Sequence, residues 1–578
     1  MTEAWHADEA QQWRSGRWSL EVRGDEFADL AYDDRVVLRS VRAVVRDRNW
    51  DTATLVVDRI DARDLALTLH VHSTGLGSDL RGIVRAEVRT GGLRVLTDLE
   101  SQTAFSTNRT GLVVLHPPVL AGSPLRVTHP DGRVEASTFP SRISPHQPAV
   151  DIARLAWSHD GLDVALGFEG DVFEMEDQRN WTDASYKTYS RPLALPFPYA
   201  LAAGERVSQW IDVRVAGEPV APMVDAVTRL RLTAGPPFPA IAVAAATAPD
   251  PAPATPAAPA HAAAVLVELD LATRNWRAAL ARATASGLPL DVRFVLADDD
   301  PAAIREGARA LQDLAVVRAT AFWPTGPARH VSDLDAIALL REALDDAGVQ
   351  THVVGGARSH FTELNREHHR LPRGLDGIVF SSTPLFHSRG TAQLVESLPI
   401  QRLVATQAAG IAGGLPVHVG PISLRPHFND VATTPPPMPA HDDLRDGYGP
   451  ALTDGSADRR QDAPELAAWT VASAAALAVP GVATLAYFEE WGPRGLRSAA
   501  GSARPVLEAV TALAALSGAP GLRGDTPDGL VWAIGARTGD TTTVLVANLD
   551  RRPRTVDVEL PDGGSRHVDV EPGTFTRV

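Results

Sequence analysis

Two glutamates, Glu363 and Glu489, stand directly after predicted strands and could carry acid–base chemistry. Glu363 lies in HFTELNRE after the strand THVVGGA, and Glu489 lies in AYFEEWGPRG at the end of another strand. We count these as strands four and seven of a parallel barrel, whose active site is built where the strands end. One acid would protonate a leaving oxygen while the other attacks or activates water, which suits hydrolysis at an acetal or acyl centre. Three neighbours are candidate substrate contacts: Asn365, Trp491 and Arg494.

The choice between Glu489 and its neighbour Glu490 stays open, because strand alternation lets only one of two successive side chains point inward. Further polar residues lie in or just after the sixth predicted strand, LPVHVGPISL, and are candidate substrate hydrogen-bonders: His418, Ser423, Arg425 and Asn429. Arg425 has two interpretations, as a substrate contact or as a loop anchor.

A second polar cluster, FEMEDQRNWTDASYKTYSR at 173–191, lies outside the predicted barrel. It contains Asp177, Trp181 and Lys187, and Lys187 is the only lysine of a chain with 55 Lys plus Arg. A lone lysine suggests a position where a compact ammonium is needed and a guanidinium does not serve. Dense hydrogen-bonding groups beside aromatic rings are typical of sugar recognition. The alternative is an interdomain clasp of salt bridges, and both interpretations stay open.

These residues must be positioned by at least two domains, since a core stops growing near roughly 250–300 residues and the chain has 578. Short alternating runs such as ALTLHVHS predict a β-sandwich over 1–240. The Ala/Pro-rich segment 243–263 predicts an extended spacer, so we place a linker at 241–262. Alternating strands and helices predict a (β/α)8 TIM barrel over 263–522, with an unclear eighth unit, and a small β domain over 523–578.

Composition restricts the function class further. A net charge of −16 argues against a nucleic-acid partner, and no apolar run is long enough to span a membrane. The chain has no cysteine, and its N-terminal residues lack the basic start and apolar stretch of a secretory signal, so we expect a cytoplasmic protein. No HExxH, GxSxG, P-loop or dinucleotide motif is present, so we expect neither a metal nor a cofactor. The predicted partner is a small sugar or sugar lactone, and a homo-oligomer is compatible with the sequence.

Several segments together resemble one family. The cluster 173–191 with its continuation PLALPFPY, NRTGLVVLHP (108–117), SRISPHQP (141–148) and YFEEWGPRG (487–495) resemble the D-apionate lactonase family of branched-sugar catabolism. The resemblance implies hydrolysis of D-apionolactone to D-apionate by a chain with a β domain, a barrel and a C-terminal β domain. The family pattern after the seventh predicted strand reads closer to YFET-x-GWRG, so Glu489 matches it, whereas Glu490, Trp491 and Pro493 depart from it.

Two other functions are compatible with the same residues. A retaining glycoside hydrolase acting on a furanoside would use the Glu363 and Glu489 pair with a covalent intermediate. A noncatalytic carbohydrate-binding protein would keep the barrel without a working acid pair. In the lactonase interpretation Arg494 or Lys187 would stabilise the oxyanion.

Overall fold

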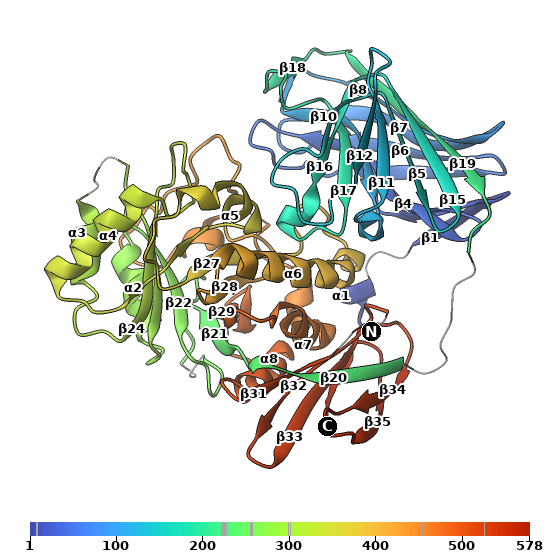
Figure 1. Cartoon of the computed structure of the whole chain (residues 1–578). Helices are drawn as coiled ribbons and strands as arrows, with labels where there is room; N and C mark the ends of the chain where they lie inside the picture. Colours follow the sequence, from blue (N-terminus) through green and yellow to red (C-terminus); the bar gives the residue numbers. More distant parts are fainter. Residues whose placement is uncertain are drawn as a thin grey trace.

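The computed structural model describes residues 1–6, 10–220, 228–254, 258–298, 300, 302–453, 455–524, 526 and 528–578. The chain forms three parts, a β-sandwich, a parallel barrel and a C-terminal β sheet, and the sandwich sits beside helices α5 and α6 of the barrel (Figure 1). The predicted fold class is thereby confirmed. Within the described residues no helix is long and apolar enough to cross a membrane.

The N-terminal part is a sandwich of two large antiparallel sheets. The order of the first is β1 (Gln11–Ser15), β2 (Trp18–Arg23), β3 (Glu26–Tyr32), β4 (Arg35–Arg46), β10 (Arg109–His116), β17 (Tyr186–Ser190), β16 (Phe173–Asp177), β13 (Ala149–Ile152). The order of the second is β12 (Val134–Thr138), β11 (Pro124–Thr128), β14 (Arg154–His159), β15 (Leu162–Glu169), β19 (Arg206–Gly217), β8 (Gly92–Ser101), β7 (Leu80–Arg89), β6 (Ala66–Ser73), β5 (Val56–Arg63). Alternating apolar side chains from both sheets form one buried core between them.

Shorter elements complete the sandwich. Strands β9 (Phe105–Thr107) and β18 (Tyr199–Leu201) pair with each other, and η1 (Pro118–Leu120) and η2 (Gln178–Trp181) are 3₁₀ turns. A short helix, α1 (Glu3–His6), precedes the first sheet and packs near η5 (Arg459–Asp462) of the barrel.

The barrel begins earlier in the chain than the sequence predicts. Its strands are β21 (Ala240–Ala244), β22 (Val265–Asp270), β23 (Leu290–Val295), β24 (Val316–Phe322), β25 (His352–Val353), β26 (Gly355–Gly356), β27 (Ile378–Ser382), β28 (Val417–Ile422) and β29 (Val482–Trp491). All pair in parallel, and β25 and β26, at the two ends of the sheet order, are separated in the chain by Val354 alone, so the barrel is nearly closed.

The prediction of an extended spacer is therefore wrong for the start of 241–262. Strand β21 lies between β22 and β29 and is the first barrel strand, and Ala242 and Val243 are buried. Short Ala side chains fit where neighbouring strands approach closely, although the same composition is typical of linkers. Residues 255–257 of the predicted linker lie outside the described residues. The strand before Glu363 is consequently the fifth, and the strand that carries Glu489 is the eighth.

Helices cover the outside of the barrel. They are α2 (Trp276–Thr284), α3 (Ala303–Arg309), α4 (Leu334–Ala347), α5 (Phe361–Glu367), α6 (Thr391–Ala412), α7 (Glu465–Leu477) and α8 (Val506–Ala514). Helix α7 is buried on every side, because α6, α8 and the C-terminal sheet all pack against it. Minor elements are η3 (His368–Arg370), η4 (Gly449–Leu452) and β30 (Gly495–Arg497).

The C-terminal sheet takes one strand from the segment before the barrel. Its order is β35 (Ser565–Val570), β34 (Arg554–Glu559), β20 (Thr228–Pro237), β31 (Pro520–Gly524), β32 (Val531–Thr538), β33 (Thr541–Asn548), β36 (Thr574–Arg577). Leu230 and Leu232 of β20 are buried in the core of this sheet. The predicted sandwich domain of 1–240 therefore extends too far, and the predicted C-terminal domain of 523–578 lacks β20, an interior strand of its sheet.

Candidate active site

A cavity opens where the barrel strands end. It lies between the carboxyl ends of β21, β22, β28 and β29 and is partly open to solvent. Its polar lining includes Thr247, Glu268, His427, Glu489 and Arg494. This is the end of a parallel barrel at which side chains from several strands converge, and where active sites of such barrels lie.

Glu489 lines this cavity, and Glu490 does not. The preceding residue, Phe488, has a φ of 54°, in the left-handed region, and the pairing of β29 with β21 shifts register nearby. Strict strand alternation is thus interrupted, so Phe488 and Glu489 both line the cavity. A non-glycine residue held in this region stores roughly 1–3 kcal/mol of strain, which is typical of functional sites.

The Glu489 carboxylate is held on both oxygens. The Thr247 hydroxyl donates to Oε1 at 2.8 Å and the Thr247 backbone N–H donates to Oε2 at 3.1 Å. Burial raises the pKa of Glu489, while Arg494, at 3.4 Å from Oε1, and Thr247 oppose this shift. Glu489 therefore combines a fixed orientation with a carboxyl group more basic than a free glutamate.

Glu268 is a second carboxylate in the cavity, and sequence reasoning missed it. Arg358 donates to both of its oxygens, at 2.6 and 2.9 Å. Burial would raise the pKa of Glu268, but Arg358 outweighs burial and holds the pKa far below the ordinary value. The only sequence signal was an acid within the mainly apolar strand VLVELD.

His427 stands beside Glu268. Its Nε2 is 3.6 Å from Glu268 Oε2, and neither ring nitrogen has a hydrogen-bond partner among the described residues. Burial lowers the pKa of His427, so the ring is neutral near pH 7. The cavity therefore presents an ionised carboxylate, a neutral imidazole and a buried carboxyl of raised pKa.

Arg494 is positioned by the loop after β28. Its guanidinium donates to the Pro426 carbonyl at 3.1 Å and to the Ser423 hydroxyl at 3.2 Å. Burial lowers the pKa of Arg494, whereas Glu489 raises it. Arg494 thus joins the last barrel strand to the loop that carries His427.

Two predicted substrate contacts on this side lie outside the cavity lining. The Arg425 side chain donates to Asp458 at 3.0 Å, as the loop-anchor interpretation expects. Trp491 packs against Ala246 and Ala248, and the Arg282 guanidinium covers its ring at 4.9 Å. Both residues support the loops around the cavity.

Glu363 is placed on another side of the barrel mouth. It lies in the first turn of α5, accepts a hydrogen bond from the Ser359 hydroxyl, and does not line the cavity of Glu489. Burial and the nearby Asp430 raise the pKa of Glu363 well above the ordinary value. His360 instead favours the ionised form of Asp430, so the pKa of Asp430 is lowered despite burial.

The Phe428 ring lies between His427, which lines the cavity of Glu489, and His330, which does not line it. It contacts His330 at 4.8 Å and His427 at 4.7 Å between ring centroids, and Arg358 lies over it at 4.0 Å. His330 is the neighbour of Asp430. The structure therefore does not bring the two predicted catalytic glutamates into one cavity.

The polar segment 173–191 packs between the sandwich and the barrel. Arg179 donates to both oxygens of Asp177, at 2.7 and 2.8 Å, and both side chains are almost fully buried. Asn365 donates to Asn180 at 2.9 Å and to the Ile143 carbonyl at 3.1 Å. Asn365 therefore joins the barrel to the sandwich, whereas the Asp177–Arg179 pair lies within the sandwich.

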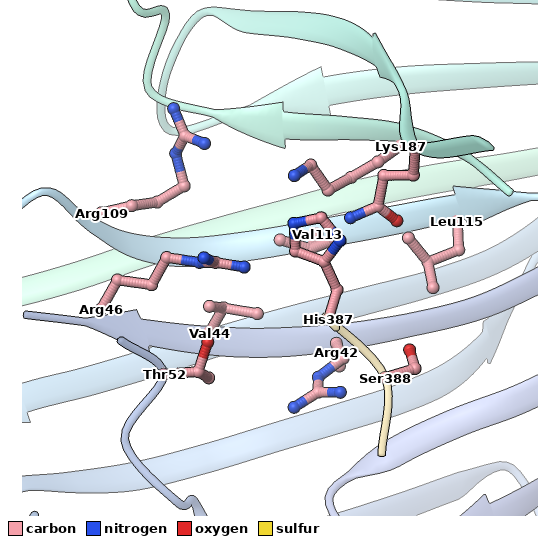
Figure 2. A pocket seen from close by; sticks show the side chains of 11 residues that line it. Arg42, Val44, Arg46, Thr52, Arg109, Val113, Leu115, Lys187, His387 and Ser388 are labelled. Carbon is pink, nitrogen blue, oxygen red and sulfur yellow. The ribbon is translucent and has the colours of Figure 1, made fainter. Parts of the chain in front are cut away.

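The other two predicted residues of this region lie at the same interface. The Trp181 ring stacks on Phe386 of the barrel with centroids 6.1 Å apart and meets His387 edge-on at 5.3 Å. Lys187 pairs with Glu176 and lines a separate cavity between the two domains (Figure 2). Within the described residues no group of three or more His, Asp and Glu side chains is arranged to hold a metal ion.

Comparisons with known proteins agree with this architecture. A family model described as "D-apionate lactonase, N-terminal domain" matches residues 1–218, and one described as "D-apionate lactonase, TIM barrel domain" matches residues 240–518. A D-apionate lactonase of Brucella anthropi is 28% identical over 551 residues, which cover 87% of each chain.

Solved structures show only a distant likeness. A GH30 endoxylanase from Clostridium papyrosolvens has 8% identity and a TM-score of 0.39, covering 61% of this chain and 99% of its own. A β-arabinopyranosidase has 12% identity and a TM-score of 0.28, covering 97% of this chain and 96% of its own. Because models of one family match both the sandwich and the barrel, the chain belongs to the D-apionate lactonase family and is a hydrolase.

Proposed function

We propose that the chain hydrolyses D-apionolactone to D-apionate in the cavity at the barrel mouth, with Glu489 as the residue that activates water. The observation that carries this proposal is the position of Glu489, a buried carboxyl of raised pKa in the cavity lining beside Arg494. Family membership supports the choice of a sugar lactone over other esters.

In the proposed reaction, Glu489 takes a proton from a water molecule as the water oxygen attacks the lactone carbonyl. The carbonyl oxygen becomes an oxyanion, and Arg494 stabilises it. When the intermediate collapses, the bond from the carbonyl carbon to the ring oxygen breaks, and Glu489 returns its proton to that oxygen. The raised pKa of Glu489 suits the first step, because it makes the carboxylate a better base than that of a free glutamate.

His427 and Glu268 position the reactants in this proposal. A neutral imidazole with two unpaired nitrogens can accept a hydrogen bond from water or from a sugar hydroxyl. Glu268, which is kept ionised by Arg358, would orient the Nε2–H of the ring and leave Nδ1 as the acceptor. His427 thus acts on the substrate or on water through a hydrogen bond, and Glu268 orients its ring.

Glu363 has a smaller role here than the sequence predicts. The sequence analysis lets Glu363 protonate the leaving ring oxygen. In this proposal Glu489 does so, with the proton that it has taken from water. Glu363, Asn365, Arg425 and Trp491 support the loops of the barrel mouth, since their contacts are with protein groups.

The test uses two adjacent glutamates as a matched pair. We expect Glu489→Gln to abolish release of acid from D-apionolactone, because the amide cannot accept the proton of water. Glu490→Gln is the control, since Glu490 is equally buried but does not line the cavity. Glu363→Gln should retain most of the activity.

Substrate class is tested with a panel of sugar lactones and aryl furanosides, scored as acid release and phenol release. Phenol release that depends on Glu489 would replace the lactonase proposal by the furanosidase alternative. Wild-type lactone turnover in Glu489→Gln would refute the proposed role of Glu489. Turnover lost in Glu363→Gln but kept in Glu489→Gln would move the reaction to the other side of the mouth.

A further inference from the structure

The barrel loop that follows β28 also contacts the sandwich. We call residues 423–433 the β28 loop, and we call residues 47–52 of the sandwich, which follow β4, the β4 turn. Nδ2 of Asn429 in the β28 loop donates to the Asn49 carbonyl and to Asp51 Oδ1 in the β4 turn, each at 3.2 Å. A loop at the mouth of the barrel is thus joined to a different domain.

A second contact lies four residues further along the β28 loop. The Thr433 hydroxyl is 3.0 Å from the Arg48 carbonyl and 2.8 Å from Asn49 Oδ1. Two residues of the β28 loop therefore face the β4 turn, and the side chain of Asn429 makes the contact nearer to the cavity.

The β4 turn is held in shape by bonds within the sandwich. Asp47 Oδ1 accepts from the backbone N–H groups of Asn49 and Asp51, at 2.8 and 2.9 Å. Arg46 donates to the Trp50 carbonyl at 2.9 Å, and Trp50 has a φ of 66°, in the left-handed region. The turn therefore presents its two acceptors to Asn429 in a fixed geometry.

The barrel holds the same loop on the other side of His427. Arg494 donates to the Pro426 carbonyl at 3.1 Å. His427 directly follows Pro426, and Asn429 comes two residues later. His427 consequently lies in a short span of the loop whose two ends are anchored by different domains.

The His427 ring has no hydrogen bond of its own to fix its direction. Neither ring nitrogen has a partner among the described residues, and Glu268 Oε2 is 3.6 Å from Nε2. The ring packs against Phe428, with the centroids 4.7 Å apart. The direction of the imidazole therefore depends on packing and on the backbone that the two anchors hold.

We propose that Asn429 is a positioning residue, which uses the β4 turn of the sandwich to hold His427 at the cavity of Glu489. The inference rests on the proposed function, in which His427 acts on water or on the substrate. It gives the sandwich a part in the reaction of the barrel. A group misplaced by about 1 Å can lower a rate by about 10²-fold, so this remote contact has a measurable effect.

The first experiment is Asn429→Asp, assayed as kcat/KM on D-apionolactone. This substitution removes the amide donor and keeps the oxygen that accepts from the Val431 N–H at 3.2 Å. The new carboxylate faces Asp51 and the Asn49 carbonyl, so it repels the β4 turn. We expect kcat/KM to fall by about 10- to 100-fold in a chain that stays folded by circular dichroism.

A swapped pair tests whether the bond between the domains is the cause. Adding Asp51→Asn to Asn429→Asp returns an amide donor and a carboxylate acceptor to the contact, with their places exchanged. The double variant should recover at least about half of the loss on a logarithmic scale. Asp51→Asn alone should stay within about twofold of the wild-type rate, because its Oδ1 still accepts from Asn429.

A double-mutant cycle with His427→Ala tests whether Asn429 acts through His427. In the His427→Ala background, Asn429→Asp should lower kcat/KM by less than about twofold. A full loss in that background, or an unchanged rate in Asn429→Asp itself, would overturn the inference. Failure of the proposed base would appear instead as wild-type turnover in Glu489→Gln.

Gln407→Glu is the matched control. Gln407 also donates across the domain interface, to the Ile143 carbonyl at 3.0 Å, and accepts from the Ile143 N–H at 2.9 Å, but it lies on α6 outside the barrel. We expect the wild-type kcat/KM in this variant. An equal loss in Gln407→Glu would show that the whole interface, and not Asn429, affects the rate, and would also overturn the inference.

Crystal structures provide a measurement that does not depend on turnover. We expect the β28 loop and the His427 ring to be displaced in Asn429→Asp, and a ring that keeps its place would contradict the inference. If Asn429→Asp does not fold, Thr433→Val replaces it in the same cycle. That variant should lower kcat/KM by at least about twofold, because it removes the second contact with the β4 turn.

Discussion

The hydrogen bond from Thr247 to Glu489 allows a quantitative test of the proposed base. Thr247→Val removes the hydroxyl that donates to Oε1 at 2.8 Å and nearly preserves the volume of the side chain. The backbone N–H of residue 247 still donates to Oε2, so the carboxylate keeps its position. The substitution therefore changes mainly the free energy of the ionised form.

The expected shift follows from the loss of one hydrogen bond to a charged group. Such a bond contributes about 1.5–3 kcal/mol, and one pKa unit corresponds to about 1.36 kcal/mol. A hydrogen bond to the carboxylate lowers its pKa, so its removal raises the pKa of Glu489 by about 1–2 units. Because the base must be ionised, the acidic limb of the profile of kcat/KM against pH should move upward by the same amount.

The assay is initial-rate acid release from D-apionolactone from about pH 4 to about pH 9, analysed as kcat/KM. Thr470→Val is the control, because the Thr470 hydroxyl is also fully buried but donates to the Leu466 carbonyl within α7. An acidic limb that stays in place, or moves to lower pH, in Thr247→Val would refute Glu489 as the base. An equal shift in Thr470→Val would show that the effect is not local.

Three further predictions concern Arg494, the buried Asp177–Arg179 pair and Glu490. Arg494→Met should lower kcat/KM by about 10²–10³, measured on D-apionolactone, as for loss of an oxyanion donor; a change in KM alone would contradict this. Arg179→Met should lower the free energy of unfolding by about 3–5 kcal/mol, because Asp177 stays buried without its partner. Adding Asp177→Asn should recover much of that loss in denaturant titrations, and no recovery would argue against an unpaired Asp177 charge as its cause. Burial raises the pKa of Glu490 to about 7, so ionising this buried carboxyl costs folding free energy above that pH. Relative to the wild-type chain, Glu490→Gln should therefore gain stability as pH rises from the unfolded pKa of glutamate through about 7, by up to about 3 kcal/mol, and should gain none at pH 4. Equal shifts of the melting temperature at pH 4 and pH 8 would contradict a buried acid at this position.

The barrel and its last catalytic candidate could be predicted from the sequence because their signals are local. Apolar strands alternating with Ala- and Leu-rich helices follow directly from burial on both faces of a parallel sheet. Glu489 stands at the end of such a strand within YFEEWGPRG, so its place at the barrel mouth follows from the strand boundary.

The first barrel strand could not be recognised in this way. Ala240–Ala244 runs into a segment rich in Ala and Pro, and five small or apolar residues have the composition of a spacer as well as of a buried strand. Only pairing with β22 and β29 distinguishes the two. Thr247 was missed for the same reason, although it holds the Glu489 carboxylate.

The sequence by itself determined the three-part architecture, the family resemblance and the candidate Glu489. The tertiary structure decided which groups share a cavity: Glu489 lies with Glu268, His427 and Arg494, whereas Glu363 does not line this cavity and Lys187 lines a different one. The physical reason is that side-chain direction depends on strand register, loop course and domain packing. The left-handed Phe488 illustrates this, since one backbone angle places Glu489 rather than Glu490 in the cavity.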